Sequence, residues 1–109
     1  MEGKTLTGVN YRYNGSLEDG LDVYKGSPSF KVSKELIDLI KSEIERKSPV
    51  LMGACRDNPN PYSIGRVLLD MGYSPQNLSY VIPLLIDEGF CEASKNKPFI
   101  ITHTKKPLK

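Results

Sequence analysis

The stretch that decides the fold is residues 63–90, SIGRVLLDMGYSPQNLSYVIPLLIDEGF. It predicts two helices joined by a tight turn. Ser63 can begin the first helix by accepting a free backbone N–H, and Gly72 can end it in the left-handed cap conformation. Ser74 can cap the second helix, with Pro75 at the first helical position, where its missing N–H costs nothing. The apolar faces of the two helices comprise Ile64, Val67, Leu68 and Met71, and Leu78, Val81, Ile82 and Leu85.

The elements on either side of this stretch are also clear in the sequence. Residues 33–47 predict an amphipathic helix with Ser33 as its N-cap. Residues 90–93 and 99–102 predict the two arms of a β-hairpin, with residues 94–98 as its turn. The apolar face of the amphipathic helix comprises Leu36, Ile37, Ile40 and Ile44.

Residues 48–62 begin with a short apolar run that predicts one strand and continue as a loop rich in Asn, Asp and Pro. Two prolines make this loop stiff, and stiff loops are suited to recognition. Turn chemistry alone also accounts for most of these residues as a helix entry. The candidate recognition residues of the loop are Arg56, Asp57 and Asn58.

The N-terminal residues 1–32 have the pattern of strands and turns. Val9, Tyr11 and Tyr13 alternate with polar residues, which predicts a half-buried strand. We expect a hairpin or an extended arm here. The turn signals are Asn14-Gly15 and Asp19-Gly20.

The order helix, strand, helix–turn–helix and terminal hairpin resembles a winged helix-turn-helix. Residues 85–90, LIDEGF, are similar to the end of the recognition helix in multiple-antibiotic-resistance-type and arsenic-repressor-type regulators. The resemblance covers residues 33–104. It implies an α+β domain of about three helices and a C-terminal β-hairpin wing, with residues 1–32 as an extension and residues 105–109 as a basic tail.

The same resemblance implies a transcriptional regulator that binds duplex DNA through helix 74–88 and the wing at 90–102. Glutamine and asparagine can pair with base edges, and lysine and arginine bind phosphates. Winged helices also bind proteins, so a protein–protein interaction module is the alternative. The candidate DNA-binding residues are Arg66, Ser74, Gln76, Asn77, Ser79, Tyr80, Lys95, Asn96 and Lys97.

Three features depart from the pattern of such regulators. Leu68 stands where the turn usually carries a small residue. Pro83 lies inside the predicted recognition helix, where it removes the hydrogen bond to the Ser79 carbonyl and is expected to kink the helix or cost about 3 kcal/mol. Residues 74–88 contain no arginine or lysine, although recognition helices usually combine base contacts with phosphate contacts.

Composition and charge limit the possible partners. The chain has 109 residues, enough for one domain, and a formal net charge of +2. The positive charge is concentrated in residues 91–109, which either bind phosphates or form a solvated tail. Because so few cations give modest affinity for DNA, we expect a homodimer.

Catalysis and metal binding find little support in the sequence. His103 is the one histidine, and Cys55 and Cys91 are the two cysteines. Their spacing lacks the close pairs of a zinc site, so we expect no catalytic residue, metal or cofactor. Cys55 could still be a redox-sensitive thiol, because the neighbouring Arg56 would lower its pKa. Without a secretory signal or a long apolar stretch, the expected location is the cytoplasm, with no membrane partner.

Overall fold

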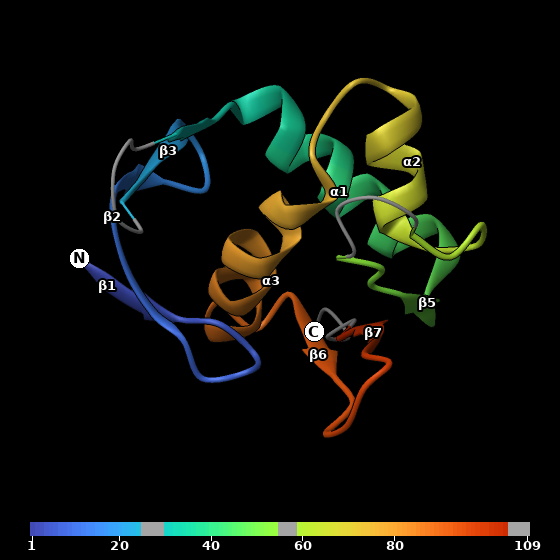
Figure 1. Ribbon diagram of the computed structural model, residues 1–109. Coiled ribbons are helices and arrows are strands. Elements are labelled where there is room, and N and C mark those ends of the chain that lie inside the picture. The colour runs from blue at the N-terminus through green and yellow to red at the C-terminus, as the bar shows by residue number, and fades with distance from the viewer. Residues whose placement is uncertain (25–29, 55–58, 105–109) are drawn as a thin grey trace, which may run out of the picture.

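Three serines begin helices at the predicted positions. The computed structural model describes residues 1–24, 30–54 and 59–104 (Figure 1). In each case the serine hydroxyl accepts a hydrogen bond from a backbone N–H in the first turn, which confirms the three predicted N-caps. These bonds join Leu36 N to Ser33 Oγ (3.1 Å), Arg66 N to Ser63 Oγ (3.2 Å) and Gln76 N to Ser74 Oγ (3.2 Å).

The helices that follow have slightly different bounds from those predicted. Helix α1 spans Lys34–Lys47 and α2 spans Ile64–Asp70. The predicted helix 74–88 is divided into a 3-10 turn, η1 (Pro75–Asn77), and an α-helix, α3 (Leu78–Asp87). Gly72 has a φ of +90°, so the turn before η1 has the left-handed conformation expected of it.

Pro83 does not end α3, which continues through it to Asp87. Proline still has no N–H for the Ser79 carbonyl, so one helical hydrogen bond is missing. The flanking side chains account for the continuity, because burial of a helix face stabilises helix beyond its local propensity. The side chains of Leu78, Val81, Ile82 and Leu85 are fully buried.

The described residues form a small α+β fold with three α-helices and two antiparallel sheets. One sheet has the strand order β1-β2-β3-β4, and the other has the order β5-β7-β6. In the second sheet Val50 is paired with Ile101, and Cys91 is paired with His103. The strands are β1 (Glu2–Lys4), β2 (Asn10–Ser16), β3 (Gly20–Tyr24), β4 (Phe30–Val32), β5 (Val50–Leu51), β6 (Cys91–Ala93) and β7 (Ile100–His103).

The N-terminal region is more extensively folded than the expected hairpin or arm, because it forms the whole four-stranded sheet. The Asn14-Gly15 pair lies inside β2 instead of forming a turn, and the chain turns at residues 17–19. Gly15 is needed there for close strand approach: a Cβ on it would lie 2.2 Å from the Gly20 carbonyl oxygen. The buried side chains of this sheet are Tyr11, Leu17, Leu21, Val23 and Val32, with Leu17 in the turn.

Helix α3 lies at the centre of the molecule (Figure 1). The N-terminal sheet lies on one side of it, while α2 and β5 lie on the other side. Strand β1 packs against α3, and β3 packs against α1. The arrangement places α3 between the N-terminal sheet and the rest of the fold.

Candidate binding surface around α3

Helix α3 is buried on two opposite faces. One face packs into the main core through side chains such as Ile82 and Leu85, both fully buried. An α-helix turns by about 100° per residue, so Tyr80 and Leu84 lie on the opposite, outward face. Tyr80 is half-buried, and Leu84 is only 6% exposed. A helix that is apolar on every side is normally enclosed by protein.

The outward face is covered by the N-terminal sheet, with Tyr11 as its anchor. The Tyr11 hydroxyl donates a 2.8 Å hydrogen bond to the Tyr80 carbonyl oxygen. The two rings meet edge to face, with centroids 5.0 Å apart and planes at 78°. Burial raises the pKa of the Tyr11 phenol far above its ordinary value, in keeping with its place inside the protein.

Leu84 lies one turn further along the same outward face. With Tyr13, Leu17 and Leu21 it lines a cavity of about 210 Å³ between α3 and the sheet. The sheet therefore covers the outward face along α3 but is packed less closely against it than the main core is. While the sheet holds this position, this face of α3 is not available to a DNA groove.

The predicted base-contacting residues have different environments. Ser74, just before η1, and Gln76, within η1, are both exposed, and Ser74 accepts the cap hydrogen bond from Gln76 N. The Asn77 amide donates a 2.9 Å hydrogen bond to the Ser74 carbonyl, so it stabilises the turn. Ser79 lines a cavity, and Tyr80 is packed against Tyr11. Gln76 is the member of the set most openly presented to solvent on η1 and α3.

Arg66 is placed in α2, with its side chain directed to the preceding loop. Its guanidinium donates a 2.7 Å hydrogen bond to the Pro59 carbonyl oxygen, and the residue is half-buried. This contact fixes the entry into α2. The predicted loop residues Arg56, Asp57 and Asn58, and the cysteine Cys55, lie outside the described residues.

The β6–β7 turn, residues 94–98, presents the predicted phosphate-binding lysines. Lys95, Asn96 and Lys97 are all exposed. Ser94 organises the turn by accepting a 2.9 Å hydrogen bond from Ile100 N. Of the four salt bridges found in the described part of the chain, none involves a lysine of this turn.

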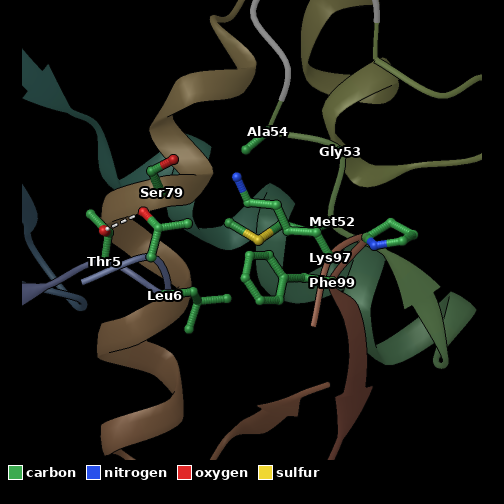
Figure 2. Close-up of a pocket in the computed structure, with 10 residues that line it drawn as sticks. Thr5, Leu6, Met52, Gly53, Ala54, Ser79, Lys97 and Phe99 are labelled. Atoms are coloured by element: carbon green, nitrogen blue, oxygen red, sulfur yellow. Dashed lines mark hydrogen bonds between the residues drawn. The ribbon is translucent and has the colours of Figure 1, made fainter. Parts of the chain in front are cut away.

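A cavity of about 570 Å³ separates this turn from α3 (Figure 2). Lys97 extends into it from the turn, alongside Met52, while Thr5, Leu6 and Ser79 form the facing wall. The described lining residues are Thr5, Leu6, Thr7, Met52, Gly53, Ala54, Ser79, Lys97, Pro98 and Phe99. Ser79 and Lys97 are predicted site residues that the structure brings to one place.

The wall formed by residues 52–54 is fixed by close backbone packing against α2. A Cβ on Gly65 would lie 1.7 Å from the Gly53 carbonyl oxygen, so position 65 requires glycine. Met52 N donates to Phe99 O, and Gly65 N donates to Met52 O, both at 3.0 Å. The main-chain N–H and carbonyl groups of Met52 are therefore both satisfied within the protein.

Of the cysteine and histidine side chains, Cys91 and His103 lie in the described residues, whereas Cys55 does not. Cys91 is 1% exposed, and burial raises the pKa of its thiol to about 11, so it stays protonated at neutral pH. Its strand partner His103 is half-buried against Phe90, with ring centroids 4.8 Å apart. Across the described residues, no cluster of three or more His, Cys, Asp or Glu is placed to hold a metal ion.

No protein-family model matches this chain, and neither does any curated protein or solved structure compared with it. None of the helices within the described ranges is long and apolar enough to cross a membrane. The functional assignment therefore rests on the geometry and chemistry of the chain itself.

Proposed function

We propose that the chain is a winged-helix module that binds another protein, with α3 as its central structural helix. The winged-helix assignment is supported by the order α1, β5, α2, α3, β6, β7. It is also supported by the sheet order β5-β7-β6, which places the strand between α1 and α2 beside the last strand of the hairpin. In this assignment the β6–β7 turn is the tip of the wing.

The covered outward face of α3 is the observation that favours a protein partner over a DNA groove. A groove-reading helix needs a free face and nearby cations for the phosphates. In this chain that face is packed against the N-terminal sheet through Tyr11, and residues 74–88 contain no lysine or arginine. Reading DNA with α3 would require the sheet to leave Tyr80 and Leu84.

The surface at the two ends of α2 is the proposed contact region. Tyr62, just before α2, is 84% exposed, and Met71, just after it, is 59% exposed. A helix of this length spans about 10 Å, so the two positions are close enough to belong to one ordinary interface. Tyrosine and methionine are enriched in protein interfaces relative to the remaining surface. Helix α2 lies away from the N-terminal sheet, so this contact leaves the covered face of α3 undisturbed (Figure 1).

The test is a binding measurement with purified components. Partners captured from a nuclease-treated extract are purified and titrated with the wild-type chain and with a Tyr62→Ala/Met71→Ala variant. We expect the variant to bind at least about tenfold more weakly, because exposed aromatic anchors dominate such interfaces. Tyr24→Ala is the matched control, since Tyr24 is an exposed tyrosine on β3. The proposal is contradicted if no complex can be reconstituted, or if Tyr62→Ala/Met71→Ala binds as tightly as the Tyr24→Ala control.

Binding of the DNA backbone by the wing is the second candidate, favoured by the exposed Lys95 and Lys97. With two phosphate contacts, the logarithm of the binding constant should fall with the logarithm of the salt concentration with a slope of about −2 for each protomer. A homodimer doubles this slope. Fluorescence anisotropy with random duplex DNA at low and physiological salt measures this slope. Loss of the signal in Lys95→Gln/Lys97→Gln supports this candidate, and no binding even at low salt excludes it.

A further inference from the structure

We propose that the cavity between α3 and the β6–β7 turn binds a small amphipathic organic anion, such as an aromatic carboxylate or sulfonate. Its apolar body would lie against Leu6, Met52 and Phe99, and its anionic group would meet the Lys97 ammonium (Figure 2). The proposal is independent of the protein-binding role, because the cavity does not include Tyr62 or Met71.

The size and lining of the cavity fit a small molecule. Its volume of about 570 Å³ lies within the usual range of ligand pockets, about 300–1,000 Å³. Such pockets combine apolar walls with a few polar groups that orient the ligand. The apolar part of this wall consists of Leu6, Met52, Ala54, Pro98 and Phe99.

The charge of the cavity selects an anion. Lys97 is the cation among the described lining residues, and none of these residues is acidic. Its ammonium takes part in none of the salt bridges found in the described chain. A ligand in the cavity can therefore accept a hydrogen bond from the charged Lys97 ammonium. Such charge-assisted hydrogen bonds are stronger than those between neutral groups.

The hydroxyl groups of the cavity give it polarity on the wall opposite Lys97. Thr5 Oγ1 lies 3.1 Å from Thr7 Oγ1 and accepts a 3.0 Å hydrogen bond from Val9 N. Thr5 thus holds the N-terminal loop in shape, while the exposed Thr7 and half-buried Ser79 lie nearer to solvent. Their hydroxyls supply further hydrogen-bonding groups on this wall, apart from the Lys97 ammonium.

The backbone around the cavity argues against a peptide as the occupant. A peptide that adds a strand needs an open sheet edge. Strand β5 pairs with β7 on one side and forms a bridge from Leu51 to Ser63 on the other. Beyond β5, Met52 N and O are bonded to Phe99 and Gly65. The recognition offered here comes from side chains, which suits a compact molecule.

The test uses two fluorescent probes with similar apolar bodies. 1-Anilinonaphthalene-8-sulfonate carries an anionic group, and N-phenyl-1-naphthylamine is neutral. We expect the sulfonate to bind more tightly, and Lys97→Gln to weaken it about five- to tenfold while leaving the neutral probe unchanged. Lys95→Gln is the matched control, because Lys95 is exposed in the same turn but does not line the cavity.

The location and the folded state are checked on the same samples. The methyl NMR signals of Leu6, Met52 and Ala54 should shift with the sulfonate, and bound probe should raise the Tm. Equal sulfonate binding in Lys97→Gln and Lys95→Gln overturns the proposal. A probe that binds without shifting the Met52 methyl, or that lowers the Tm, also overturns it. If the neutral probe binds more tightly than the sulfonate, the proposed preference for an anion is overturned. None of these results depends on whether a protein partner is found.

Discussion

The two faces of α3 differ in how they are buried. The core face is closed by side chains with no solvent exposure, such as Ile82 and Leu85. The outward face is covered by a sheet that relies on the Tyr11 hydroxyl and leaves a cavity of about 210 Å³ beside Leu84. The first face is closely packed, whereas the second face leaves space beside Leu84 that no side chain fills. A helix that resembles a DNA reader in sequence can therefore be enclosed by its own N-terminal segment.

The largest expected effect on the free energy of unfolding comes from truncating two neighbouring leucines that lie on the two faces of α3. Leu85→Ala should lower the free energy of unfolding by about 4 kcal/mol, because it opens a void in a closely packed core. Leu84→Ala should cost about 2 kcal/mol, because its side chain already borders a cavity. Urea denaturation followed by circular dichroism measures both. Equal losses would show that the two faces are packed alike.

A smaller effect is expected at the anchor of the sheet. Tyr11→Phe removes the hydrogen bond to the Tyr80 carbonyl and should cost about 1 kcal/mol. The amides of β1 and β2 should exchange with deuterium faster, while those of α1 change little. Tyr13→Phe, on the same strand, is the control. Unchanged exchange in Tyr11→Phe would mean that the hydroxyl does not hold the sheet to α3.

Alkaline pH should lower the stability of the fold through the buried thiol of Cys91. Burial raises the pKa of the Cys91 thiol from 9.0 to about 11. Below pH 9 the folded and unfolded chains both keep this proton, so stability is constant. Between pH 9 and 11 the unfolded chain loses it first, so stability falls as the pH rises. Unfolding measured at pH 8, 9.5 and 11 should show this fall, and Cys91→Ala should reduce its slope. An identical slope in Cys91→Ala contradicts the assignment.

The smallest effect on stability is expected for the wing lysines. Lys95→Gln/Lys97→Gln should change the free energy of unfolding by less than about 0.5 kcal/mol, because both residues are exposed and belong to neither face of α3. Thermal unfolding measures this. A larger loss would mean that the β6–β7 turn supports the fold, and binding defects in this variant could then not be assigned to lost contacts.

The sequence predicts the helix starts and the C-terminal hairpin well because capping and turn residues lie within or next to the elements that they define. The serine caps at Ser33, Ser63 and Ser74 and the antiparallel β6–β7 hairpin are confirmed, with bounds that differ by about one residue. The cover over α3 was not predicted, since it depends on long-range packing between Tyr11 and Tyr80. One signal could have indicated it: VIPLLI, residues 81–86, is a continuous apolar run, and such runs favour burial on every side.

The candidate cavity could be predicted only in part. Ser79 and Lys97 were singled out for DNA contacts, and both line it. Besides Pro98 and Phe99, which follow Lys97, its walls come from the N-terminal loop and from residues 52–54, which are far apart in the chain. No periodicity or motif links these segments, because they meet only through the docking of the sheet and the close approach of Gly53 to Gly65.

The most direct test of the central claim is an NMR measurement of the contact between the N-terminal sheet and α3. With ring centroids 5.0 Å apart, Tyr11 and Tyr80 should give nuclear Overhauser effects between their aromatic protons in the full-length chain. The account predicts these signals together with slow exchange of the β2 amides. Their absence, with α1 and α3 still folded, would contradict the account, because the outward face of α3 would then be open to DNA.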